Sequence, residues 1–175
     1  MTPALRRASS AVALLAVALW LGGLVALGAV AAPIVFSVVP LPWSADAMTV
    51  VFRRFDRVAM VCAALALVTE AVRALARASF RRIDMARAGV TALAATAAVF
   101  EGMSLSPRIA ELHAGGAIRS VAAAGMELTR LHDMAEWCGK AEVVLLAAVV
   151  VLHVVAFSTP VDVEPAEKIP SGTPR

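Results

Sequence analysis

The sequence predicts an all-α fold, an integral membrane four-helix bundle with an amphipathic helical outer loop. Of the 175 residues, 61% are hydrophobic and 17% are charged, whereas about 45–50% of an average soluble domain is apolar. No Asp, Glu, Lys or Arg lies between Arg7 and Asp46, and an uncharged apolar stretch longer than about 18 residues is typical of a transmembrane helix. Three more apolar blocks follow along the chain, so we expect four spans.

The four spans form one predicted membrane domain, residues 11–157. A bilayer core needs ~20 residues per helix, and the Ala-rich flanks of the three shorter apolar blocks allow them to reach that length. The spans are expected at about residues 11–39, 55–76, 86–103 and 136–157. We expect Arg57, Arg73 and Arg87 to extend from span ends to the membrane interfaces.

Short segments flank the membrane domain at both ends. Residues 1–10 precede it, and the proline-rich residues 158–175 are expected to form a disordered tail. The first span is expected to be retained and not cleaved as a signal peptide. Its apolar run is much longer than the ~7–15 residues of a signal-peptide core.

The first span has an unusual composition for a helix. Its segment WLGGLVALGAVAAPIVF contains Gly22, Gly23, Gly28 and Pro33. Small residues let helices approach closely in lipid, so the glycines are predicted to form a packing surface for a neighbouring helix. Pro33 is expected to kink or end the span. Trp20 lies in the middle of the apolar run, which favours a role in packing or in a polar site over an interfacial anchor.

The longest link, residues 104–136, is the predicted amphipathic outer loop. Ser106-Pro107 favours the start of a helix, and Gly115-Gly116 should end it. Apolar and small residues then recur at helical spacing from Ile118 to Thr129, on the way to the fourth span.

The distribution of arginine predicts the orientation. The short second link has five arginines within residues 73–87, and the N-terminus has Arg6 and Arg7. The positive-inside rule places both segments, and with them the C-terminus, in the cytoplasm. Three arginines in residues 53–57 weigh against this orientation. We expect a bacterial cytoplasmic membrane protein with both termini in the cytoplasm.

This topology gathers ionisable residues near the outer surface. The candidate polar site comprises Glu101, His132, Glu136, Lys140 and Glu142. The cluster is either a solvated, salt-bridged helix entrance or a binding site for an ion or small polar solute, since ionisable residues within spans tend to line polar paths. Glu101 and Glu142 are the strongest candidates because they lie inside or beside apolar runs.

Glu70 and His153 are a candidate inner pair, because both lie in the inner halves of predicted spans. They are expected either to respond together to protons or to be structural. In the structural alternative, Glu70 pairs with Arg73 and His153 hydrogen-bonds to a carbonyl.

The outer face also has residues that could bind a metal ion. His132 and Glu136 could share a metal, with His113 and Asp133 as further ligands, but zinc takes three or four ligands and one helix pair supplies two. The methionines near this side would suit Cu(I), although methionine more often fills a core. His132 and His153 are 21 residues apart, about 30 Å along one helix, which is too far to ligate one haem iron. Neither a metal nor a cofactor is therefore predicted.

Several motifs resemble those of a known family. WLGGL followed by AAPIVF in the first span, FRRFD before the second, SPRI after the third and LHDMAEW before the fourth are similar to the transmembrane-protein-205-like family. These are small integral membrane proteins, also described as a domain of unknown function. The resemblance covers residues 11–157 and implies a four-span membrane protein with no established reaction. Family members tend to have a hydroxyl and an Asn where this chain has Ala135 and Gly139. The opening motif also resembles, more distantly, copper resistance protein D.

The sequence argues against two classes of function, enzymes and nucleic-acid-binding proteins. It has no GxSxG, P-loop or HExxH motif, so an enzyme is not predicted. Its basic residues are not interleaved with aromatic ones, which argues against nucleic-acid binding. We expect a transport, channel-like or accessory membrane protein with its polar site at the outer face. The alternative is a metal- or haem-binding membrane protein for copper handling or electron transfer. The expected partners are the lipid bilayer and either further copies of the chain or a larger membrane complex.

Overall fold

The computed structural model of the chain describes residues 3–76 and 81–158, and these residues form helices joined by short links, with no strand among them. The elements in chain order are α1 (Pro3–Val25), η1 (Ala26–Ala31), α2 (Ala32–Val38), α3 (Trp43–Leu75), α4 (Arg82–Phe100), η2 (Glu101–Leu105), α5 (Ser106–Ala114) and α6 (Ala122–Ser158). The two η elements are π-helical turns that join α1 to α2 and α4 to α5 without a break.

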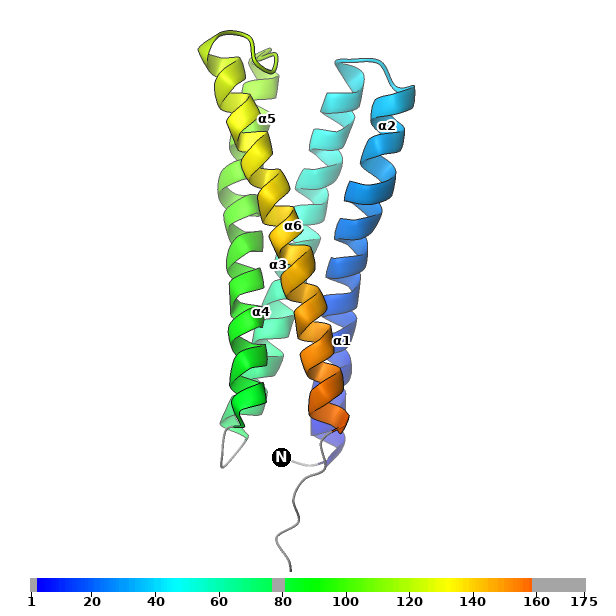
Figure 1. Cartoon of the computed structure of the whole chain (residues 1–175), viewed down its shortest axis with the longest axis vertical. Coiled ribbons are helices and arrows are strands. Elements are labelled where there is room, and N and C mark those ends of the chain that lie inside the picture. Colours follow the sequence, from blue (N-terminus) through cyan, green and yellow to red (C-terminus); the bar gives the residue numbers. More distant parts are fainter. Residues whose placement is uncertain (1–2, 77–80, 159–175) are drawn as a thin grey trace, which may run out of the picture.

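The elements form four long rods that run alternately up and down (Figure 1). The rod that starts with α1 packs against α3 and α6, and α4 packs against the same two helices from the other side. Both ends of the described chain lie at one end of the bundle, together with the last turn of α3 and the first turn of α4 (Figure 1). We call this the termini end, and the opposite end, which holds α5, the α5 end.

All four rods are long and apolar enough to cross a membrane, so the chain is an all-α membrane helical bundle, as the sequence predicts. The second, third and fourth rods are longer than the predicted spans. They extend over Trp43–Leu75, Arg82–Ala114 and Ala122–Ala156. A 33-residue helix is about 50 Å long, against ~30 Å for the hydrocarbon core, so each rod extends beyond it.

The outer loop is built from continuations of the membrane helices. Its first part is α5, in which Pro107 occupies the first turn and Gly115 follows the last residue, as the sequence predicts. Gly116 adopts a φ of +75°, a left-handed conformation that glycine tolerates best. The predicted amphipathic stretch from Ile118 mostly forms the beginning of α6, where Leu128 is fully buried against Ile109 and Leu112 of α5. The predicted tail lies, from residue 159 onwards, outside the described residues.

The first rod passes its proline without ending. The chain leaves the α-helical register at η1, and α2 continues through Pro33 to Val38. Proline has no N–H and crowds the carbonyl four residues earlier, and a π-helical turn is one of the ways a helix accommodates such a site. Of the two expected outcomes at Pro33, a kink or the end of the span, the second is wrong, because the helix runs on to Val38.

Helix packing relies on alanine more than on glycine. Seven buried alanines belong to the main core, with Trp20, Val17, Cys62, Leu146 and Val149. They are Ala16 on α1, Ala59, Ala63 and Ala66 on α3, and Ala94, Ala95 and Ala98 on α4. Small side chains at helical spacing bring the backbones together, which is how helices associate in lipid.

The glycines of the first span behave differently from one another. A Cβ atom placed on Gly23 would lie 2.2 Å from Cε2 of Phe55, so α1 and α3 approach closely there. Gly22 and Gly28 are exposed, and a Cβ on either would meet nothing within 4 Å among the described residues. The predicted glycine surface is thus reduced to Gly23, because the other two glycines face away from the bundle.

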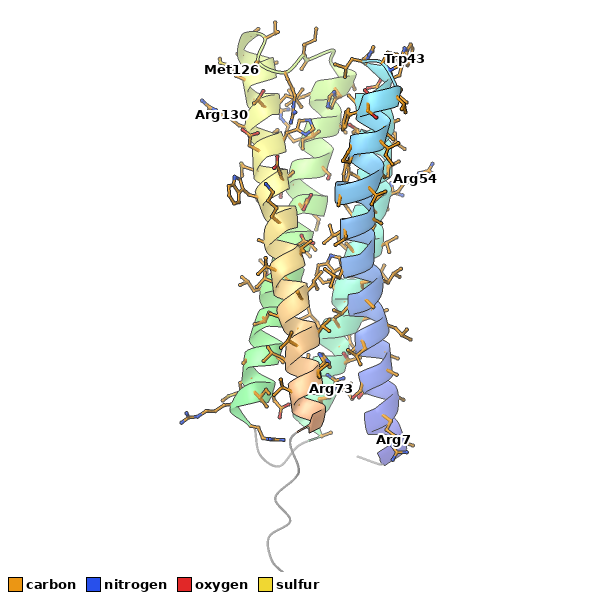
Figure 2. The ribbon with its side chains drawn as sticks, turned by 45° about the vertical axis from the view of Figure 1, so that its right-hand side comes forward. Arg7, Trp43, Arg54, Arg73, Met126 and Arg130 are labelled. Atoms are coloured by element: carbon orange, nitrogen blue, oxygen red, sulfur yellow. The ribbon has the colours of Figure 1, made fainter. Side chains whose placement is uncertain are left out.

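The outside of the bundle is largely apolar, as lipid requires. Figure 2 shows Trp43, Arg54, Met126 and Arg130 at the periphery, while Arg73 lies between the helices near the termini end. Arg73 and Arg87 are 4% and 2% exposed. The expectation that these two arginines extend to the interface is wrong, because both are held inside the bundle by acidic partners.

Candidate functional site

The interior of the bundle has two polar layers. The one nearer the α5 end contains three carboxylic acids, and we call it the carboxylate layer: Asp56, Glu101 and Glu142, with Trp20 and Ser106 as hydrogen-bond donors. The one near the termini end is charge-balanced, and we call it the ion-pair layer: Glu70, Arg73, Asp84, Arg87 and His153. Together the two layers account for most of the buried charge among the described residues.

Glu142 is the most enclosed member of the carboxylate layer. It is 2% exposed, and its Oε2 accepts a hydrogen bond of 2.9 Å from the indole Nε1–H of the fully buried Trp20. Its other oxygen, Oε1, has no hydrogen-bond partner in the part of the chain that the structure describes. A buried carboxyl oxygen without a partner is costly, so this atom is a site where a ligand or proton would be stabilised.

Asp56 and Glu101 complete the layer from α3 and η2. The hydroxyl of Ser106 donates a hydrogen bond of 2.5 Å to Oδ2 of Asp56. Glu101 is half-buried and lies within electrostatic range of both Asp56 and Glu142. It is also the first residue of the π-helical turn η2, and π-helical turns in helices frequently occur at functional sites.

An apolar layer separates the two polar layers. On α6 it consists of Leu146 and Val149, which lie between Glu142 and His153, and the core alanines of α1, α3 and α4 fill the same level. Glu142 and His153 are 11 residues apart on α6, which is about 16 Å along the axis. The core residues that pack together at this level come from all four long helices and are hydrophobic.

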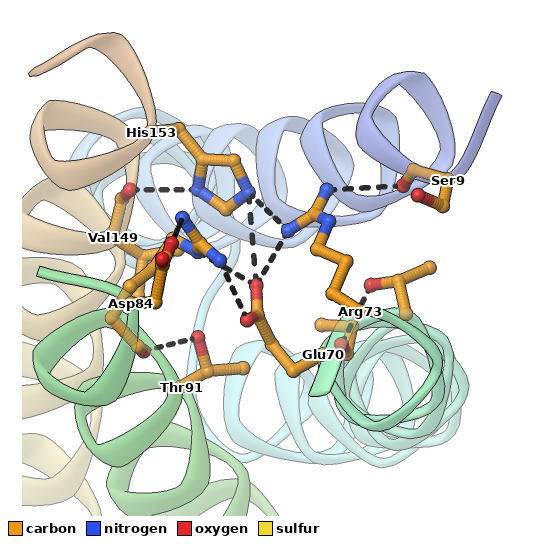
Figure 3. Close-up of polar contacts among 10 residues, drawn as sticks. Ser9, Glu70, Arg73, Asp84, Thr91, Val149 and His153 are labelled. Carbon is orange, nitrogen blue, oxygen red and sulfur yellow. Dashed lines mark hydrogen bonds and ion pairs between the residues drawn. The ribbon is translucent and has the colours of Figure 1, made fainter. Parts of the chain in front are cut away.

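The ion-pair layer is centred on Glu70 (Figure 3). Its Oε1 accepts hydrogen bonds from Nη1 of Arg73 at 2.6 Å and from Nε of Arg87 at 2.8 Å, and its Oε2 accepts one from Nη2 of Arg87 at 2.9 Å. Arg87 also binds Oδ1 of Asp84 at 3.1 Å. The bidentate geometry between Arg87 and Glu70 is the strong form of this interaction.

His153 joins α6 to this layer. Its Nδ1 is 2.9 Å from the carbonyl of Val149, and its Nε2 is 3.1 Å from Nη1 of Arg73. A guanidinium can only donate, so the consistent assignment has Nε2 as acceptor and the proton on Nδ1. Arg73 also donates to the carbonyl of Ser9 at 3.2 Å. The layer thus ties together α1, α3, α4 and α6.

The predicted inner pair lies within this layer, 3.9 Å apart between Nε2 of His153 and Oε1 of Glu70. The structural alternative describes the contacts found: Glu70 pairs with Arg73, and His153 contacts a backbone carbonyl. Arg73 and Arg87 already hydrogen-bond to the Glu70 carboxylate, which would have to share a proton with His153 in a proton-sharing pair.

The predicted outer polar site is divided among three places. Glu101 and Glu142 belong to the carboxylate layer. Glu136 and Lys140 form an exposed ion pair of 2.6 Å on the surface of α6, where Lys140 also lies over the ring of Trp137. His132 faces His113 of α5. No hydrogen bond or ion pair between described residues joins Glu101, on η2, to the other two places, and Glu136 and Lys140 are exposed whereas Glu142 is buried.

The residues described offer no complete metal site: no three side chains of His, Cys, Asp or Glu come together as a ligand set. Glu136 is engaged by Lys140, so it does not share a metal with His132 in this arrangement. His132 and His153 lie at opposite parts of α6 with different partners, which excludes a haem iron held by both.

The chain matches a protein family. The family described as "Domain of unknown function (DUF4149)" matches residues 15–118, more than half of the chain. The chain belongs to this family. No curated protein and no solved structure matches it. The comparisons provide no support for a relation to the transmembrane-protein-205-like family or to copper resistance protein D.

The DUF4149 match covers some of the site residues and not others. Trp20, Asp56, Glu101 and most of the ion-pair layer lie within residues 15–118, whereas Glu142 and His153, both on α6, lie beyond them. The candidate sites predicted from the sequence left out Asp56 of the carboxylate layer and Arg87 of the ion-pair layer, whereas Arg73 was the partner expected for Glu70 in the structural alternative. One signal was available, since Asp56 lies at helical spacing from the buried alanines of α3.

Proposed function

We propose that this DUF4149 protein takes part in moving protons across the membrane, with the carboxylate layer as the site that takes up the proton. The observation that carries the proposal is Oε1 of Glu142, an unpartnered oxygen on a side chain that is 2% exposed. Ionisable residues inside membrane bundles are rare and mark proton and ion pathways.

The charge of the layer favours uptake of a positive species. Asp56, Glu101 and Glu142 repel one another, and no basic side chain hydrogen-bonds to any of them within the described residues. Like charges in a poorly solvated interior are destabilising until one is neutralised. A proton needs one acceptor oxygen, whereas a metal ion needs a convergent ligand set that these residues do not provide.

The apolar layer favours an alternating-access mechanism and argues against an open channel. Alanines, Leu146 and Val149 close the interior between the carboxylate layer and the termini end. A proton bound near Glu142 therefore reaches the other side only after the helices rearrange. The close approach at Gly23 and the π-helical turns are places where such a rearrangement could begin.

The orientation proposed for this protein places the termini end in the cytoplasm of a bacterium, as the arginines of the N-terminus and the second link favour. Cysteine labelling tests it with Ala76→Cys at the termini end and Ile118→Cys at the α5 end, both exposed positions. The background variant lacks Cys62 and Cys138. An impermeant reagent added to intact cells should label position 118 only. Labelling of position 76 alone would reverse the orientation.

Proton movement is tested with the purified chain in liposomes that contain a pH-sensitive dye. Under an imposed membrane potential, the wild-type protein should change the internal pH and Glu142→Gln should not. Glu136→Gln is the matched control, because Glu136 is exposed and paired with Lys140 on the same helix. Wild-type liposomes that behave like empty ones, or a Glu142→Gln variant as active as wild type, would refute the proposal.

A further inference from the structure

His113 and His132 lie opposite each other near the α5 end, outside both polar layers. Their Nε2 atoms are 3.3 Å apart, and their ring centroids are 5.6 Å apart with the rings nearly perpendicular at 72°. His113 comes from the last turn of α5 and His132 from α6. Both side chains are half-buried, so the space between them is sheltered and still accessible to small ions.

The spacing of the two nitrogens matches a metal site. Zinc binds imidazole nitrogen at about 2.0–2.1 Å, so two such ligands of a tetrahedral ion lie about 3.4 Å apart. A hydrogen bond between two neutral imidazoles would also fit the distance. In that case one imidazole would donate its N–H to the other, and the pair would serve only in packing.

The two histidines are held on a rigid support. Leu112, next to His113, packs with Ile109 against Leu128 of α6. Arg108 of α5 donates hydrogen bonds of 2.8 and 3.2 Å to the two carboxylate oxygens of Glu127 on α6. Metal ligands on packed helices keep their geometry better than ligands on loops, which lowers the cost of binding.

We propose that His113 and His132 form a two-histidine site for a zinc-class divalent transition-metal ion. No third His, Cys, Asp or Glu among the described residues joins the pair, so water or an exogenous ligand would fill the other positions. It is distinct from the proton site, because no hydrogen bond or ion pair between described residues joins either histidine to the carboxylate layer.

The test is metal binding to the purified full chain carrying an affinity tag without histidine. Co²⁺ serves as a spectroscopic probe, and Zn²⁺ is titrated in competition. His113→Gln and His132→Gln should each weaken binding by at least ~10-fold, the size of effect that outer-sphere partners of metal ligands already show. Helix content and elution from size exclusion in detergent should match those of the wild type, which separates loss of ligand from loss of fold.

Glu136→Gln is the control that distinguishes the alternatives. Under the proposal it binds metal like the wild type, because Glu136 is paired with Lys140. Loss of binding in Glu136→Gln and His132→Gln but not in His113→Gln would overturn the proposal in favour of a site along one helix. Absence of a cobalt spectrum in the wild type, or binding unchanged in both histidine variants, would leave only a hydrogen-bonded pair.

Discussion

The two polar layers of the bundle contain similar numbers of acids but differ in their partners. In the ion-pair layer, the acids Glu70 and Asp84 are matched by Arg73 and Arg87. In the carboxylate layer, three acids share two neutral donors, Trp20 and Ser106. The first arrangement neutralises charge and cross-links four helices. The second keeps an unfavourable charge distribution in place, and that is expected where a group is retained for function.

Burial of an ionisable residue is therefore not by itself a sign of function. Glu70 and Glu142 are similarly enclosed, at 8% and 2% exposure. The number of donors around each carboxylate is what separates them: Glu70 accepts three hydrogen bonds from two arginines, and Glu142 accepts one from an indole.

The largest effect is expected for Arg87→Met. This change leaves Glu70 with a single arginine and removes a partner of Asp84, and breaking one side of a buried ion pair typically costs about 3–5 kcal/mol. Unfolding by a denaturing detergent in mixed micelles measures the loss. Arg54→Met is the control, since Arg54 lies at the exposed periphery of α3. Equal stability of the two variants would remove the structural role assigned to the ion-pair layer.

The next effect is expected at the contact between α1 and α3. Gly23→Leu places a side chain where the ring of Phe55 lies, and overpacking of this kind costs about 1–3 kcal/mol. Gly22→Leu on the adjacent, open face should leave stability unchanged. A Phe55→Ala change combined with Gly23→Leu should recover part of the loss. The account of this contact fails if the Gly22 and Gly23 variants are equally stable.

Trp20→Phe is expected to have a smaller effect than the loss of Arg87. It keeps an aromatic ring in the core and removes the one hydrogen bond that the described residues give to the Glu142 carboxylate, at a cost of about 1–3 kcal/mol for a buried acceptor left unpaired. In Glu142→Gln, Trp20→Phe should cost less, because a neutral amide is less expensive to leave unpaired than a carboxylate. Costs that are the same in both backgrounds would show that the indole does not act through Glu142.

Glu142→Gln alone should have the smallest effect on stability of the buried changes. It removes a source of repulsion and keeps an acceptor for Trp20, so the expected change in unfolding free energy is within about 1 kcal/mol of zero. The same conservative change at the other layer, Glu70→Gln, should be clearly destabilising because Arg73 and Arg87 each lose an acidic partner. A Glu142→Gln variant as unstable as Glu70→Gln would erase the distinction between the layers.

The sequence carried enough information for the fold class but less for the site. Long apolar runs predicted four helices, and Pro107 with Gly115-Gly116 predicted where α5 begins and ends. These features act locally. The bond between Trp20 and Glu142 joins residues 122 positions apart, and the one between Asp56 and Ser106 spans 50. Nothing in either local segment indicates which partner the fold will provide.

Two errors show why local reasoning was misleading inside the membrane. Arg73 and Arg87 were expected at the interface because they flank apolar blocks, yet each faces inward on its helix, where Glu70 binds both. Glycines were expected to mediate packing because small residues let helices approach closely in lipid. Alanine is present throughout the chain, so its concentration on the inner faces of α3 and α4 becomes visible only in three dimensions.

Our main proposal is that the carboxylate layer holds a bound proton, and that Glu142 is required to hold it. Infrared difference spectroscopy of the lipid-reconstituted protein tests it most directly, because a protonated carboxylic acid has its own carbonyl band that shifts on deuteration. The account predicts this band in the wild type at neutral pH, its loss or displacement in Glu142→Gln, and no change in Glu136→Gln. A wild-type spectrum without the band, or a Glu142→Gln spectrum that superimposes on the wild type, would contradict the claim.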